Sequence, residues 1–129
     1  MDLTRSGPVA LAETRLAWLD ARQRVLARNV ANSDTPGYRP RDAVPFGTLL
    51  SRAVPATAMA TTDARHIAPG GAAAQARADR RTSERAPNGN AVSLDEQALK
   101  IAETDQAHAV AIGLHRKYLG LFRTALGRG

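Results

Sequence analysis

Apolar residues recur at alternating spacings of three and four near both ends of this 129-residue chain. The first series lies within residues 8–32: Val9, Ala12, Leu16, Leu19, Gln23, Leu26 and Val30. The second series reaches almost to the end of the chain: Leu94, Ala98, Ile101, Asp105, His108, Ile112, His115, Leu119, Phe122 and Leu126. This spacing is typical of helices that pack along their length. We therefore predict an all-α fold, with long N- and C-terminal helices and an irregular, loop-rich middle.

Both predicted helices carry start signals. Pro8 suits a first helical position, because its missing N–H would be unpaired there anyway, and Ser6 or Gly7 can cap the helix. Ser93-Leu-Asp-Glu96 is a capping box, in which Ser93 accepts from the N–H of Glu96 and Glu96 reaches back. We place the two helices within residues 1–42 and 93–129.

The predicted helix faces differ in width. Trp18 lies off the first series, so it either widens the apolar face or meets a second partner. Charged residues on the other side are expected to keep this helix soluble: Glu13, Arg15, Asp20, Arg22, Arg24 and Arg28. A second apolar stripe makes the C-terminal helix too broad for one facing helix to cover: Ala111, Leu114, Tyr118, Leu121 and Ala125.

This width predicts two kinds of contact. One set of C-terminal residues, Ile112, Leu119 and Phe122, is expected to pack within the subunit against Leu16, Leu19 and Leu26. The other set, Leu114, Tyr118 and Leu121, is expected to face a neighbouring subunit.

The first helix is expected to stop in the segment Ala31-Asn-Ser-Asp-Thr-Pro-Gly-Tyr38. Asn32 can adopt the left-handed conformation after a last helical turn, and the proline pushes Thr35 out of the helical region. Pro36 and Gly37 fit the central positions of a type II turn, so Gly37 is expected to have a positive φ. Tyr38 then leaves in a new direction.

Residues 43–92 show no periodicity that predicts a stable element, because prolines and glycines interrupt every pattern. Phe46, Leu49 and Leu50 could dock as a short hydrophobic anchor, and residues 72–86 have the composition of a transient helix. Pro87-Asn-Gly-Asn90 is a second turn signal.

The residue types do not favour a metal site, a cofactor site or a catalytic site. The chain has no cysteine, and its three histidines do not have the spacing of zinc ligands, so no metal or cofactor is predicted. Asp105, His108 and His115 share one helical stripe, but no nucleophile, phosphate loop or ligand cluster joins them. We interpret them as residues that set helix register or contact a partner, and we predict that the chain is not an enzyme. The formal charge of +6 is not accompanied by interleaved aromatic residues, so nucleic acid is not an expected partner.

The sequence shows no pattern typical of a secretory signal or of a membrane-spanning segment. The first residues lack a basic region followed by an apolar run, and no apolar stretch is long enough to cross a bilayer. We therefore expect neither a cleaved secretory signal nor a membrane anchor.

The segment Leu26-Ala-Arg-Asn-Val-Ala-Asn32, followed by Asp34-Thr-Pro-Gly-Tyr38 and Arg39-Pro-Arg-Asp42, resembles the N-terminal signature of the bacterial flagellar rod and hook family of axial proteins. Three later segments resemble its proximal rod members: Pro87–Glu96, Lys100-Ile-Ala-Glu103 and Tyr118–Leu126. A segment ending in His66-Ile67 is similar as well. The chain departs from the family at Gln97-Ala98, where Glu-Met is common, and at Val44-Pro45-Phe46, which replaces the usual Asp-Phe.

The resemblance implies a structural subunit of the basal-body rod, in which the long N- and C-terminal helices pair as an antiparallel, coiled-coil-like hairpin. It implies that the subunit assembles through these helices, with itself and with other rod proteins, into a helical tube that transmits torque. It further implies export through the flagellar export apparatus, a periplasmic location, and contact with the protein that joins the rod to the membrane ring. The signature residues are Asn29, Ala31, Asn32, Asp34, Thr35, Pro36, Gly37 and Tyr38. The expected assembly residues are Leu16, Leu19, Leu26, Val30, Ile101, Ile112, Leu114, Tyr118, Leu119, Leu121 and Phe122.

Three segments then make up one axial rod domain, namely residues 1–42, a variable middle of residues 43–92, and residues 93–129. The residues alone also permit a helical homodimeric binding module, such as an export chaperone or an adaptor, which would use the same stripes in a closed dimer. A nucleic-acid-associated protein would rest on net charge alone.

Overall fold

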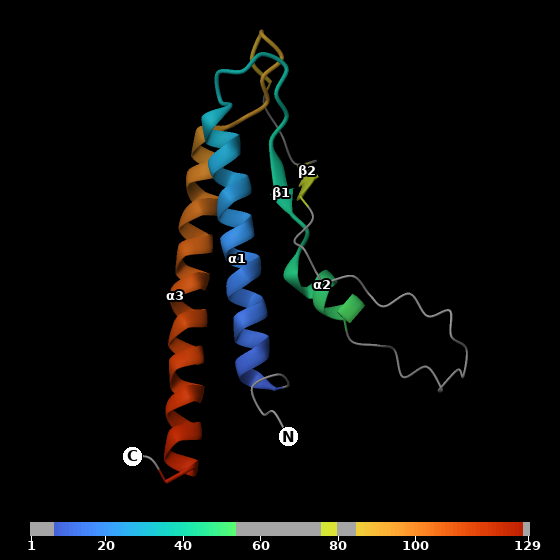
Figure 1. Cartoon of the computed structure of the whole chain (residues 1–129). Coiled ribbons are helices and arrows are strands. Elements are labelled where there is room, and N and C mark those ends of the chain that lie inside the picture. The colour runs from blue at the N-terminus through green and yellow to red at the C-terminus, as the bar shows by residue number, and fades with distance from the viewer. Residues whose placement is uncertain (1–6, 54–75, 80–84, 128–129) are drawn as a thin grey trace, which may run out of the picture.

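The computed structural model describes residues 7–53, 76–79 and 85–127 (Figure 1). The elements in chain order are α1 (Pro8–Ala31), β1 (Arg41–Ala43), α2 (Phe46–Ala53), β2 (Ala76–Ala78) and α3 (Leu94–Ala125). The segment that ends at Ile67 lies outside these residues. The predicted hairpin is confirmed, since α1 and α3 run antiparallel, side by side, and the turns that follow α1 and precede α3 meet at one tip (Figure 1).

Both long helices begin as predicted. Gly7 is the N-cap of α1, and Pro8 occupies its first turn. The side chain of Ser93 accepts a hydrogen bond from the N–H of Glu96 at 3.4 Å, so half of the capping box is present. Glu96 turns instead toward Lys100, 2.8 Å away.

Three polar pairs fix the register of the hairpin. Asp105 accepts from Gln23 at 3.2 Å. His108 lies 3.3 Å from Asp20, and His115 lies 3.4 Å from Glu13. Residue numbers fall along α1 by the same steps as they rise along α3, which is the pattern of an antiparallel pair in one register. Of the two roles expected for Asp105, His108 and His115, setting helix register or contacting a partner, these contacts within the chain support the first.

The row of α3 residues that packs against α1, here called the seam, differs from the predicted series at every second position. Its buried residues are Gln97, Thr104 and Ala111, one position before the expected Ala98, Asp105 and Ile112. The shared positions Ile101, His108, His115 and Phe122 are half-buried, whereas Leu94 is exposed. Polar partners assist this burial: Thr104 donates to the carbonyl of Lys100, and the side-chain oxygen of Gln97 accepts from Asn29, whereas the side-chain nitrogen of Gln97 has no partner among the described residues.

Near the tip of α1, a polar residue likewise takes the buried position that an apolar residue was expected to fill. Leu19 and Leu26 are buried as expected, but Val30 is 37% exposed and Asn29 takes the buried position beside it. Burial of Asn29 is possible because its amide is fully hydrogen-bonded, as shown below.

The core lies in the middle of the hairpin. Trp18, Leu19 and Ala111 form its buried centre, and Leu16 and Ala107 pack against it. The three polar pairs place Leu16 level with Ile112, as expected, but they set Leu19 and Leu26 nearer the tip than Leu119 and Phe122, so the expected packing is wrong in register for these residues. Since Gln23 bonds Asp105, Leu26 lies still nearer the tip and cannot reach Ile112.

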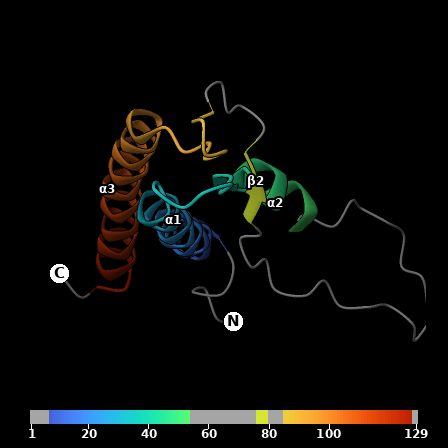
Figure 2. The ribbon, with the colours of Figure 1, turned by 90° about the horizontal axis from the view of Figure 1, so that it is seen from above.

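A strap, residues 40–53, runs along α1 and comprises β1 and α2 (Figure 1, Figure 2). β1 pairs with β2 in an antiparallel register that sets Asp42 opposite Arg77. The expectation of no stable element in residues 43–92 is wrong for α2 and β2, and residues 76–78 form a strand instead of part of a transient helix. This short pairing joins segments more than thirty residues apart, so no local pattern announces it.

The predicted hydrophobic anchor is part of the strap. Phe46 and Leu49 pack against the core, while Leu50 is 38% exposed. The rings of Trp18 and Phe46 are 5.9 Å apart, and the indole N–H of Trp18 donates to the carbonyl of Val44 at 2.8 Å. The second partner of Trp18 is therefore the strap of its own chain.

Candidate assembly site

The first turn at the tip begins where α1 ends. Asn32 follows the helix with φ −105°, and its side-chain amide donates back to the carbonyl of Arg28 at 2.8 Å. The expectation that Asn32 is left-handed is wrong, because a side-chain bond to the last turn does the capping without an unfavourable φ.

The type II turn is confirmed. The N–H of Tyr38 donates to the carbonyl of Thr35 at 3.2 Å, and Gly37 between them has φ +71°. Pro36 and Gly37 are both exposed, and so are Ala31 and Asp34. These four residues of the turn are therefore in contact with solvent.

A second turn locks into the first. It spans Ala86–Asn90, with Gly89 at φ +81°. The N–H of Gly37 donates to the carbonyl of Asn88 at 3.1 Å, and the N–H of Ala91 donates to the carbonyl of Tyr38 at 3.0 Å. A Cβ on Gly89 would lie 3.5 Å from the Cα of Gly37, so the two backbones are in contact. We call residues 31–38 and 86–91 the interlocked turns.

Asn90 joins the two turns through its side chain, which is 4% exposed. Its amide nitrogen donates to the carbonyls of Thr35 at 2.6 Å and Asn32 at 2.9 Å. Its amide oxygen accepts from the N–H of Val92 at 2.8 Å. One side chain therefore bonds the end of α1 and the chain that leads into α3.

Asn29, one turn below, joins three elements. Its oxygen accepts from the N–H of Arg41 at 3.0 Å and from the hydroxyl of Tyr38 at 3.2 Å. Its nitrogen donates to the carbonyl of Arg41 at 2.6 Å and to the side-chain oxygen of Gln97 at 2.8 Å. Asn29 thus connects α1, the strap and α3, which gives this signature residue a structural role.

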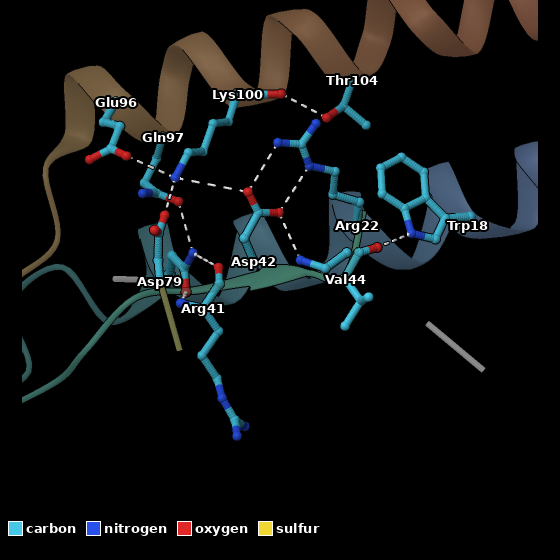
Figure 3. Close-up of polar contacts among 12 residues, drawn as sticks. Trp18, Arg22, Arg41, Asp42, Val44, Asp79, Glu96, Gln97, Lys100 and Thr104 are labelled. Atoms are coloured by element: carbon cyan, nitrogen blue, oxygen red, sulfur yellow. Dashed lines mark hydrogen bonds and ion pairs between the residues drawn. The ribbon is translucent and has the colours of Figure 1, made fainter. Parts of the chain in front are cut away.

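Below Asn29, an ion-pair cluster ties the strap to both long helices (Figure 3). Asp42 receives a two-pronged contact from Arg22, with distances of 2.9 and 3.0 Å. The ammonium of Lys100 lies 3.9 Å from Asp42 and also contacts Glu96 and Asp79. Two basic residues from α1 and α3 therefore converge on one strap carboxylate.

The cluster stabilises the charged forms of its bases. The hydrogen bond with Asp42 raises the pKa of Arg22 despite partial burial. Burial would lower the pKa of Lys100, but its bonds to Asp79 and Glu96 outweigh that effect and raise the pKa. Because the pairs are half-buried, removing one partner is expected to cost more than the pair itself contributes.

Sequence reasoning missed this cluster. It placed Arg22 on the solvent side, and Asp42 and Lys100 entered only through the family resemblance. One local signal was available, since Glu96 and Lys100 have the i, i+4 spacing of helical ion pairs. The contacts to Asp42 depend on the strap, whose path the sequence pattern does not predict.

The third feature is an exposed apolar stripe on α3, made of Leu99, Val110, Leu114 and Leu121, which are 61%, 58%, 46% and 56% exposed. At about 100° per residue, the four lie within roughly 60° of one another around the helix. Leu114 and Leu121 were expected to be free for a neighbour, whereas Tyr118 is half-buried, as are Ile112, Leu119 and Phe122. Contiguous exposed apolar side chains of this kind commonly mark a surface that contacts another molecule.

The described residues form neither a metal site nor a membrane span. No group of three or more histidine or acidic side chains there is placed to hold a metal ion. None of the described helices combines the length and apolarity that a membrane span needs.

Comparisons with known proteins point in one direction. A family model described as flagella basal body rod protein matches residues 11–39, which cover most of α1 and the first turn. A flagellar basal body rod protein FlgB of Cereibacter sphaeroides is 32% identical over 108 residues, covering 83% of this chain and 84% of the relative. FlgB of Agrobacterium fabrum is 35% identical over 57 residues, covering 44% of this chain and 42% of the relative.

Proposed function

This chain belongs to the flagellar basal body rod protein family, as a relative of FlgB, and on that premise we propose that its helical hairpin is the part that builds it into the rod. It is a structural subunit of the rod that assembles with other rod components, and not an enzyme. A closed homodimeric chaperone or adaptor is not favoured by this membership.

The observation that carries the proposal is the exposed apolar stripe on α3. A single hairpin leaves Leu99, Val110, Leu114 and Leu121 in water, although α1 and the strap already fill the neighbouring face. In a rod the subunits surround one another, so a neighbouring helix would remove this surface from water. Since each side chain is about half exposed, covering the rest of it would contribute about 1 kcal/mol, roughly half the value for a fully exposed side chain, before the costs of association.

The interlocked turns and the signature residues have a different part in this proposal. They hold α1 and α3 at a fixed offset, so that residues from both helices present one rigid surface. The three segments 1–42, 43–92 and 93–129 then act as one axial domain. We further propose export through the flagellar export apparatus to a periplasmic position, and contact with the protein that joins the rod to the membrane ring.

Complementation tests this function. A strain that lacks the gene should regain motility with the natural chain, and the chain should be found in purified basal bodies. Leu121→Asp should abolish incorporation, because it puts an unpaired charge into an apolar contact. Arg116→Asp is the matched control, since Arg116 is also exposed on α3 but lies outside the stripe. Normal incorporation of Leu121→Asp would remove the stripe from the assembly surface.

A further inference from the structure

Arg15 is a cation held in position without a counter-ion. Its guanidinium carbon lies 4.7 Å from the ring centre of Trp18 and 4.7 Å from that of Phe46. In the parts of the chain that the structure describes, it pairs with no carboxylate. Burial, and then the charge of Arg22, lowers the pKa of Arg15, as expected for a guanidinium that has lost water without gaining an anion.

An open cleft adjoins this cation. It has a volume of about 480 Å³ between α1 and α3. Its lining residues are Arg15, Glu103, Gln106, Ala107, Val110, Ala111 and Leu114. Val110 and Leu114 belong to the exposed stripe. Glu103 also lines the cleft, but its charge acts on Arg22, whose pKa it helps to raise, so among the described residues Arg15 keeps a positive charge without a carboxylate partner. Apolar walls beside such a cation suit an apolar helix surface that carries a carboxylate.

The chain itself supplies such a surface. Most described carboxylates are already engaged: Glu13 and Asp20 with histidines, Asp42, Asp79 and Glu96 in the ion-pair cluster, and Asp105 with Gln23, while Glu103 lines the same cleft. Of the rest, Asp34 sits in a polar turn. Asp95 is exposed in the first turn of α3, beside Leu94, which is 54% exposed, and one turn before the exposed Ala98.

We propose that Asp95 of one subunit pairs with Arg15 of the next, with Leu94 and Ala98 of the first subunit seated on the cleft at Leu114 of the second. This inference rests on the proposed function and names a second copy of the chain as the occupant. Within one subunit the pair cannot form, because Asp95 lies at the tip and Arg15 far along the hairpin.

The geometry gives the offset between the two copies. The contacts Glu13 to His115 and Asp20 to His108 bracket Arg15, which therefore lies level with about residue 113 of α3. Asp95 is about 18 residues nearer the tip, or about 27 Å along a helix that rises about 1.5 Å per residue. Two parallel subunits would thus be staggered by about 27 Å. Contact between unlike surfaces does not close into a pair and extends from copy to copy.

A charge exchange tests the pairing. Arg15→Glu and Asp95→Arg should each weaken association of the purified full chain about tenfold or more, because each sets like charges together. The chain that carries both changes should associate almost as well as the natural one, since every contact then regains opposite charges. Asp34→Arg is the matched control and should leave association unchanged. Circular dichroism confirms folding, and Arg15→Gln provides a milder variant if Arg15→Glu unfolds. Failure of the double change to restore association would overturn the pairing.

Crosslinking in the assembled rod provides the second test, and the absence of natural cysteines makes it specific. A short bismaleimide should join Leu94→Cys and Leu114→Cys only when both variants are present in the same basal bodies. Crosslinks between two copies of the same variant would indicate a symmetric contact. Crosslinks only to other rod proteins would mean that those proteins occupy the cleft. Either result would overturn the proposal. If basal bodies contain the chain but show no crosslink, the inference fails while the rod function stands. If they lack the natural chain, the proposed function itself fails.

Discussion

Replacement of Asn90 by alanine should open the tip of the hairpin. The change removes three hydrogen bonds, two to the carbonyls of Asn32 and Thr35 and one from the N–H of Val92. Each bond contributes about 0.5 to 1.5 kcal/mol net. Since the freed groups lie near the surface and regain water, we expect a total loss of about 2 to 3 kcal/mol in the free energy of unfolding.

Two variants sharpen this prediction. Asn90→Asp has nearly the same size, yet it replaces the donor with an oxygen that faces two carbonyl oxygens at 2.6 and 2.9 Å. It should therefore destabilise the tip at least as much as alanine. Asn88→Ala is the control in the same turn, because it removes one bond, from the N–H of Asn90, and should cost about 0.5 to 1 kcal/mol.

Urea unfolding followed by circular dichroism gives the free energies, and hydrogen exchange locates the change. The N–H groups of Gly37 and Ala91 bond across the two turns, so their protection should fall in Asn90→Ala before that of mid-helix amides. If Asn90→Ala costs no more than Asn88→Ala, or if these two amides keep their protection, Asn90 does not hold the turns together.

Three further predictions concern the turn, the core and the ion-pair cluster. Gly37→Val should be poorly tolerated, since a β-branched side chain is strained at φ +71°; motility of a strain with this change, compared with Gly47→Val, checks it. Leu19→Ala should cost about 2 to 5 kcal/mol because Leu19 is 1% exposed, and the half-buried Leu119→Ala should cost clearly less in the same urea titration. Because the pKa of Lys100 is raised in the folded chain, its contribution to stability is fully present below pH 10.5 and is lost as the pH rises through the folded-state pKa. The melting temperature of the natural chain should therefore be lower above this pH than below it, and the difference should be smaller in Lys100→Met.

The sequence was sufficient to predict the parts of the fold that depend on local chemistry. The cap at Ser93, Pro8 in the first turn of α1 and the turn at Gly37 follow from backbone preferences of single residues, and all are present. The two long helices followed from apolar spacing, which is a property of each helix by itself, whereas their antiparallel pairing was implied by the family resemblance.

What the sequence did not predict depends on partners that are distant in the chain. Gln97 and Thr104 are buried polar residues with hydrogen-bond partners, Asn29 for the side-chain oxygen of Gln97 and the carbonyl of Lys100 for Thr104, and a pattern that counts only apolar residues passes over them. Arg22 looks solvent-exposed until the strap brings Asp42 beside it. The path of the strap depends on Trp18, Val44 and Phe46 together, so no single segment encodes it.

The candidate site shows the same division. The signature segment marked Asn29 and Asn32 as important, yet only the folded chain shows that the bonds of Asn29 and Asn90 connect both helices, the strap and the second turn. The exposed apolar stripe was half predicted: Leu114 and Leu121 are exposed, Tyr118 is half-buried, and Leu99 and Val110 were missed. A rotation of the seam by one residue at alternate positions explains these differences.

Electron cryomicroscopy of basal bodies purified from a strain that expresses this chain tests the account most directly. The account predicts that rod density accommodates the α1–α3 hairpin, with the interlocked turns at one end and the stripe of Leu99, Val110, Leu114 and Leu121 covered by a neighbouring subunit. Rod density that contains the chain but leaves this stripe facing solvent, or basal bodies complete without the chain, would contradict it.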